Sequence, residues 1–157
     1  MGENMNNFKF RKFILAIVLL VFPTSIFAGS GHYHYDGPDI SGAKIKIFGP
    51  WLAPEDESFR DVLSIFEKET GASVEYGGSD EFEQIINIDC KAGNPADIAV
   101  FPQPGLAANI AATGCLAPQG DDLKQMVLDD YAAGQSWVDL TTYADANGKD
   151  QFYGIFF

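Results

Sequence analysis

A short apolar run that ends at two prolines constrains the fold of this chain more than any other feature. Residues Asp97 to Phe101 read Asp-Ile-Ala-Val-Phe, which is typical of a strand in a parallel sheet covered on both faces. Pro102 and Pro104 cannot continue the strand, and they fix the backbone on both sides of Gln103. Ligands of open α/β sheets bind beyond the carboxyl ends of the strands. Phe101, Pro102 and Gln103 are therefore candidate ligand-binding residues.

Strand and helix patterns alternate along the rest of the chain. We expect strands at 43–48, 72–76 and 97–101, and helices that begin at Pro54, after Gly78, at Leu106 and after Asp121-Asp122. Right-handed crossovers in this order bring the strands into one parallel sheet. The sequence therefore predicts an α/β fold with helices on both faces of a parallel sheet.

The first helix carries start and stop signals of its own. Pro54 suits the first helical position, and the three carboxylates after it suit the positive end of the helix dipole. Gly71 suits the left-handed position that ends a helix. Helical periodicity predicts one buried stripe, which consists of Phe59, Val62, Leu63 and Phe66.

Later elements carry weaker signals. Ser79 or Asp80 can cap the second helix, and Glu83 is spaced to complete a capping box with Asp80. In the fourth helix we expect three side chains to face inward, namely Leu123, Met126 and Val127. Asn147-Gly148 predicts a turn before a final strand over residues 152–157.

Trp51, Ser79 and Asp80 are three further candidates for ligand binding, beside Gln103 of the proline loop. Trp51 follows the Gly49-Pro50 pair that ends the first strand, so its indole ring could stack on a ligand, or it could cap the core of the sheet. Ser79 and Asp80 follow the second strand, where helix capping alone would also explain them. Gln103 offers both a donor and an acceptor, which suits a ligand rich in hydroxyl groups.

The two cysteines, Cys90 and Cys115, form an even pair. In an exported protein such a pair favours a disulfide, although two buried thiols are the alternative. Two cysteines alone supply too few ligands for a metal site.

The histidines lie close together near the amino terminus. His32, His34 and Asp36 could in principle hold a divalent metal, but the segment precedes the first strand and lacks the further ligands of a zinc site. We expect neither a metal nor a cofactor.

The amino terminus has the pattern of a secretory signal peptide. Three basic residues precede the apolar run 13–22, which is too short to span a bilayer, and a small residue, Ala28, ends the segment. We expect cleavage after Ala28, a flexible segment over 29–40 and a periplasmic location.

Charge and missing motifs narrow the classes of function. Removing residues 1–28 takes three of the 10 Lys and Arg and one of the 22 Asp and Glu, which leaves 7 against 21 and a net charge of −14. Nucleic acid is therefore not an expected partner. The chain has no nucleophile elbow, phosphate-binding glycine loop or zinc-protease helix, and we expect no enzyme. Paired carboxylates could still form the active site of a hydrolase, which remains an alternative.

Four stretches of the chain resemble the extracellular solute-binding proteins of ABC transporters, in the sugar-binding class and within it the α-glucoside-binding group. They are residues 41–52, 78–84, 93–106 and 131–140, in the order of the family. The resemblance implies a two-lobed protein that closes on its sugar by a hinge and delivers it to the membrane subunits of an importer. It also implies a monomer, with the turn at Ser79 and Asp80 facing the cleft. A periplasmic carbohydrate-active hydrolase and a binding protein for a non-sugar solute remain the alternatives to this function.

The resemblance bears on the carboxyl terminus as well. The chain ends on the aromatic run Phe152 to Phe157, near the point where chains of this family first cross to the other lobe. We expect residues 41–157 to be an amino-terminal lobe, truncated near this crossover.

Overall fold

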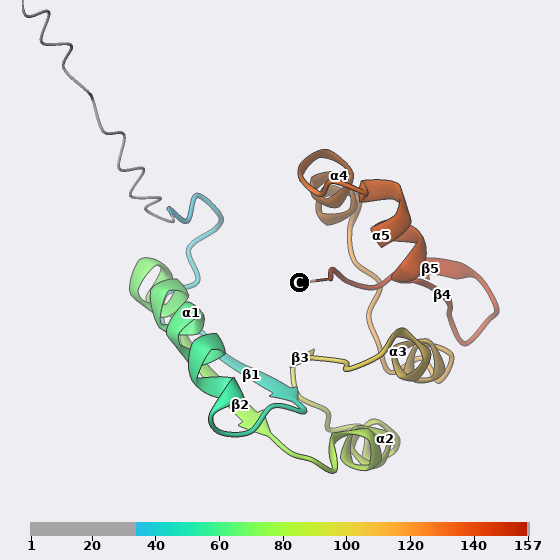
Figure 1. The fold of residues 1–157 in the computed structure, drawn as a ribbon, viewed down its shortest axis with the longest axis horizontal. Coiled ribbons are helices and arrows are strands. Elements are labelled where there is room, and N and C mark those ends of the chain that lie inside the picture. The colour runs from blue at the N-terminus through green and yellow to red at the C-terminus, as the bar shows by residue number, and fades with distance from the viewer. Residues whose placement is uncertain (1–33, 157) are drawn as a thin grey trace, which may run out of the picture. The chain divides into compact units, whose positions relative to one another are not determined.

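The computed structural model describes residues 34–156, so the predicted signal peptide lies outside the described residues. Three parallel strands form the central sheet in the order β2-β1-β3. They are β1 (Lys44–Gly49), β2 (Ser73–Gly78) and β3 (Ile98–Ala99), and β1 pairs with β2 from Lys44↔Ser73 to Gly49↔Gly78. This confirms the parallel sheet (Figure 1).

Helix α1 (Glu55–Thr70) covers one face of the sheet. Ile47, Tyr76 and Val100 form a buried cluster there, and Phe59 and Leu63 of α1 pack against it. Gly71 ends the helix with φ 70°, as predicted. The predicted stripe was wrong at one position, because 61% of Val62 is exposed. The buried stripe of α1 includes Asp56 and Thr70, and Val62 lies on its flank.

Helices α2 (Phe82–Ala92) and α3 (Pro104–Ala111) pack against the other face. Their buried side chains form a second cluster, made of Phe82, Ile86, Leu106 and Ile110. Phe48 of β1 and Ala99 of β3 pack against this cluster. The prediction of helices on both faces of the sheet is therefore confirmed.

Strand β3 is shorter and more exposed than predicted. Ile98 is 49% exposed, whereas Val100 is buried in the cluster under α1. Helix α1 packs most closely against β2, which lies at the opposite edge of the sheet from β3. The predicted burial of β3 on both faces is therefore wrong at Ile98. The edge strand β3 lies to the side of α1, which covers the other strands of the sheet.

The predicted capping box at the start of α2 was wrong. The N-cap residue is Glu81, and no side chain caps the helix. Instead, the backbone N–H of Glu81 donates to Ser79 Oγ at 3.1 Å, which closes a small turn before the helix. The Glu83 side chain accepts a hydrogen bond from Gln103.

Beyond α3 the chain forms two helices and a hairpin. Helix α4 (Asp121–Asp130) and helix α5 (Gly134–Leu140) are followed by strands β4 (Thr142–Ala144) and β5 (Asp150–Phe152), which pair antiparallel. Val127, Val138 and Phe152 form their buried cluster. Neither α5 nor β4 was predicted.

Two predictions for this part were wrong and two were confirmed. Val127 of α4 is buried, as expected, but Met126 is 37% exposed and lies outside the buried stripe of the helix. The final strand spans 150–152 rather than 152–157, and Phe152 is buried in the cluster with Val127. Asn147-Gly148 lies in the turn between β4 and β5, as expected. No helix within residues 34–156 is long and apolar enough to cross a membrane.

Candidate binding site at the carboxyl ends of the strands

Three turns leave the sheet at the carboxyl ends of its strands. They follow Gly49, Gly78 and Val100, and each carries candidate residues. Gly49 is the register partner of Gly78, and the Ser79 N–H donates to the Gly49 carbonyl oxygen at 3.0 Å. On the other side of β1, the Val100 N–H donates to the Phe48 carbonyl oxygen at 2.8 Å. Parallel register thus brings the three turns together.

The turn after β1 is held by a tyrosine that the sequence did not single out. The Tyr76 hydroxyl accepts a hydrogen bond from the Trp51 N–H at 3.0 Å and donates one to the Trp51 carbonyl oxygen at 3.2 Å. The Trp51 ring is half-buried and meets the Phe59 ring edge-on, with 5.2 Å between ring centroids. Trp51 therefore contributes to the core, while part of its surface stays accessible to solvent.

A charged pair lies beside Tyr76. Asp56 and Arg60 of α1 form a 2.8 Å ion pair, and the Arg60 guanidinium also donates to the Tyr76 carbonyl oxygen at 3.1 Å. Burial raises the pKa of Tyr76 above its ordinary value, and the Asp56 charge adds to the rise. The Tyr76 hydroxyl thus stays neutral at physiological pH and keeps its donor to the Trp51 carbonyl.

The turn after β2 presents polar groups on its surface. Ser79 is half-buried and its hydroxyl oxygen accepts the Glu81 N–H, whereas Asp80 is exposed. Ser79 therefore serves the local turn, and Asp80 is the accessible group of the pair.

The turn after β3 rests on the first turn of α2. The Phe101 ring meets the Phe82 ring edge-on, with 5.6 Å between centroids, so Phe101 is half-buried in the second cluster. Pro102 and Gln103 are exposed, and Gln103 Nε2 donates to Glu83 Oε1 at 3.0 Å. The spacing from Asp80 predicts a capping-box role for Glu83, whereas its carboxylate contacts Gln103, which no sequence pattern indicated.

The chemistry of these turns suits a neutral, hydroxyl-rich ligand. Aromatic, amide and carboxylate groups are present in residues 49–52, 78–83 and 101–104, and none of these positions is Lys or Arg. Carboxylates and amides accept hydrogen bonds from hydroxyl groups, and aromatic faces cover apolar ring faces. Within the described part of the chain, no group of three or more His, Cys, Asp or Glu is placed to hold a metal ion.

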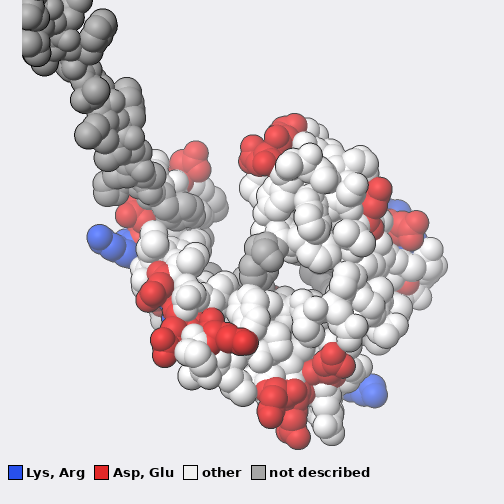
Figure 2. Space-filling view, viewed as in Figure 1, with Lys and Arg blue, Asp and Glu red and all other residues white. Residues whose placement is uncertain are grey.

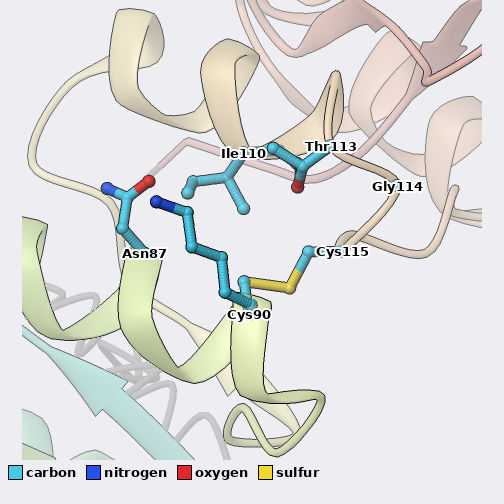
Figure 3. Close-up of a pocket in the computed structure, with 7 residues that line it drawn as sticks. Asn87, Cys90, Ile110, Thr113, Gly114 and Cys115 are labelled. Carbon is cyan, nitrogen blue, oxygen red and sulfur yellow. A yellow bond between two sulfur atoms is a disulfide. The ribbon is translucent and has the colours of Figure 1, made fainter.

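Two cavities lie away from these three turns. One of about 230 Å³ is lined by the disulfide and by side chains of α2 and the end of α3, including Asn87, Ile110 and Thr113 (Figure 3). The other, of about 250 Å³, borders Lys46, Glu75 and Asn94. Neither of these two cavities is lined by the ligand candidates.

Cys90 and Cys115 are joined by a disulfide in this structure, with 5.6 Å between their Cα atoms. The bond links the last turn of α2 to the segment after α3 (Figure 3). It lies at the opposite end of α2 from Glu83. The two helices are thus linked at one end by a covalent bond and at the other by the Gln103–Glu83 hydrogen bond.

Acidic side chains are scattered over the face seen in Figure 2, in several separate groups with few basic side chains among them. This distribution is typical of a solvated acidic surface rather than of one docking patch.

Two curated proteins are similar in sequence to this chain. The alpha-glucosides-binding periplasmic protein AglE of Rhizobium meliloti (strain 1021) is 51% identical over 114 residues, which cover 73% of this chain and 24% of AglE. The osmoprotective compounds-binding protein GgtB of Synechocystis sp. (strain ATCC 27184 / PCC 6803 / Kazusa) is 32% identical over 136 residues, covering 84% of this chain and 30% of GgtB. No protein-family model matches the chain.

The chain thus spans less than a third of the length of these relatives. Both are binding proteins by name rather than enzymes. The identity to AglE, together with a parallel β2-β1-β3 sheet that has helices on both faces, assigns the fold and the family together. The chain belongs to the extracellular solute-binding proteins of ABC transporters.

Proposed function

We propose that the protein is the periplasmic substrate-binding component of an ABC sugar importer. It captures an α-glucoside or a similar oligosaccharide and delivers it to the membrane permease. The match to AglE, at 51% identity, supports the α-glucoside as the ligand class. The observation that carries the proposal is that the turns of Trp51, Asp80 and Gln103 all follow the carboxyl ends of neighbouring parallel strands and contain no basic residue.

Each group has a defined part in this proposal. The accessible part of the Trp51 ring covers the apolar side of a glucose ring, and Asp80 and Gln103 bond to its hydroxyls. Phe101 and Pro102 lie beneath the sugar, and Ser79 holds the turn that presents Asp80. A buried sugar hydroxyl without a partner would cost affinity, so these polar groups also select the ligand.

Residue ranges follow from the same proposal. Residues 1–28 direct export and are removed, and residues 41–157 contribute to the amino-terminal lobe. A hinge between two lobes closes the full-length protein, a monomer, over the sugar.

Isothermal titration calorimetry of the full-length protein tests the proposal. We expect saturable binding of maltose or trehalose, and weaker binding by about 1 to 3 kcal/mol in Trp51→Ala, the range for a lost stacking partner. Because Trp51 also packs on Phe59, the thermal unfolding of the variant must be measured alongside.

Three outcomes would count against these assignments. No heat of binding with any α-glucoside contradicts the ligand class, and an osmoprotective solute that binds instead would favour a role like that of GgtB. Release of free glucose during the titration would indicate a hydrolase. Unchanged affinity in a folded Trp51→Ala variant would make Trp51 a core residue only.

A further inference from the structure

Gln103 is exposed at the end of its turn, and its side chain does not cap the helix that follows. It occupies the N-cap position of α3 with extended backbone angles, φ −154° and ψ 144°, yet no side chain caps that helix. An exposed glutamine amide in such a position would ordinarily adopt either of two orientations, with the oxygen or the nitrogen outward.

Glu83 removes this freedom. Gln103 Nε2 lies 3.0 Å from Glu83 Oε1, and an ionised carboxylate accepts hydrogen bonds but cannot donate them. Only the amide nitrogen of Gln103 can therefore face Glu83. The carbonyl oxygen of the amide is turned the other way.

A second contact holds the same loop on the same turn of α2. Phe101 lies two residues before Gln103 and packs edge-on against Phe82, the residue before Glu83. Phe82 is only 1% exposed, so the first turn of α2 is anchored in the core. An apolar contact and a polar contact thus fix the loop together.

We propose that Glu83 is a positioning residue of the sugar site, which holds the Gln103 amide so that its carbonyl oxygen faces the ligand. This inference rests on the proposed function. In this arrangement Gln103 acts as a hydrogen-bond acceptor, and the site selects ligands that present a hydroxyl donor to it. The selection acts through the orientation of Gln103 rather than through contact of Glu83 with the sugar.

The chain supplies a matched control for this pair. Gln135 Nε2 donates to Asp139 Oδ1 at 2.7 Å, which is also an exposed amide–carboxylate pair, but within α5. Asp139→Asn removes an equivalent carboxylate outside the three turns.

The first test uses affinity in the full-length protein. Glu83→Gln should weaken maltose or trehalose binding about fivefold, the effect of one net hydrogen bond, because the Gln103 amide can then turn either way. Asp139→Asn should bind like the wild type, and thermal unfolding should be unchanged in both. In a Gln103→Ala background, Glu83→Gln should have no further effect. Wild-type affinity in Glu83→Gln, or an equal loss in the Gln103→Ala background, would overturn the inference.

The second test does not depend on a sugar. In nuclear magnetic resonance spectra, the Gln103 side-chain NH₂ signals should shift with pH as the carboxylate that they face is protonated. Asp80 and Glu81 are further carboxylates of the same turn, so the comparison with Glu83→Gln isolates the contribution of Glu83. Signals that move equally in wild type and Glu83→Gln would overturn the inference. If the wild type binds no sugar, the proposed function fails, and this measurement still decides whether Glu83 positions Gln103.

Discussion

Gly78 lies where the turns after β1 and β2 meet, and it has no space for a side chain. A Cβ atom at this position would overlap the Trp51 carbonyl oxygen. That oxygen is the one to which the Tyr76 hydroxyl donates its hydrogen bond. The absence of a side chain at Gly78 therefore lets the Trp51 turn close onto the end of β2.

Gly78→Ala should consequently lower the free energy of unfolding by about 1 to 3 kcal/mol, the usual cost of overpacking, as measured by urea denaturation. Gly105→Ala is the control, because a Cβ there meets no atom within 4 Å. That change should be neutral or stabilise the protein by up to about 1 kcal/mol. Equal stability of the two variants would show that the Trp51 turn is not closely packed on Gly78.

The residues of the candidate site were predictable only where their signal is local. Pro102 and Pro104 marked the loop that carries Gln103, and Gly49-Pro50 marked the turn that carries Trp51. Tyr76 and Glu83 were missed because their partners lie 25 and 20 residues away in the sequence. Their roles depend on strand register, which no short motif contains. Whether these residues bind a sugar remains a prediction.

At the scale of elements, helices with their own start and stop signals were predicted best. α1 begins just after Pro54 and ends at Gly71. α5 has seven residues, too few for a helical period to emerge, and β4 has three. The prediction of burial was wrong at Val62, Ile98 and Met126, because the burial of a single side chain depends on how far the neighbouring elements extend.

The turn of the β4–β5 hairpin contains a carboxylate, Asp145, whose pKa is shifted by backbone hydrogen bonds. The backbone N–H groups of Lys149 and Asn147 donate to Asp145 Oδ1 at 3.0 and 2.8 Å, and they hold the pKa of Asp145 below its ordinary value of 3.8. Because the folded state favours the ionised form, Asp145 stabilises the fold above the unfolded pKa. This stabilisation is lost as the pH falls through the folded pKa.

Urea denaturation between about pH 6 and about pH 2 should therefore show a smaller acid-induced loss of stability in Asp145→Asn than in the wild type. Asp150→Asn is the control, since the hydrogen bonds of the turn go to Asp145 and not to Asp150. The same acid profile in wild type and Asp145→Asn would contradict a role for this carboxylate in the turn.

For the whole molecule, the order of the elements predicted more than any single residue did. Alternating strands and helices allow few arrangements, because crossovers between parallel strands are right-handed. The predicted α/β class and the family assignment both follow from this order and from motifs spread along the chain. Helical coverage of both faces is observed in the two clusters on either side of the sheet.

Formation of the disulfide should depend on export of the whole chain. The amino-terminal segment has the composition of a signal peptide, and AglE is periplasmic by name. Disulfides form and persist in such oxidising compartments, whereas the cytosol keeps thiols reduced. Cys90 and Cys115, which are bonded in the structure, should therefore pair only after export.

We expect the protein purified from the periplasm to begin at Gly29, and peptide mapping without reduction to recover Cys90 and Cys115 as one linked pair. A variant without residues 2–28, made in the cytosol, should contain two free thiols. Its free energy of unfolding should be lower by up to about 3.5 kcal/mol, the chain-entropy estimate for a loop of this length. The double variant Cys90→Ser, Cys115→Ser in the exported protein should show the same loss. It distinguishes the effect of the missing disulfide from the effect of the cellular compartment. Periplasmic protein that retains Met1, or in which both cysteines are alkylated without reduction, would contradict this account, because neither cleavage nor pairing would then accompany export.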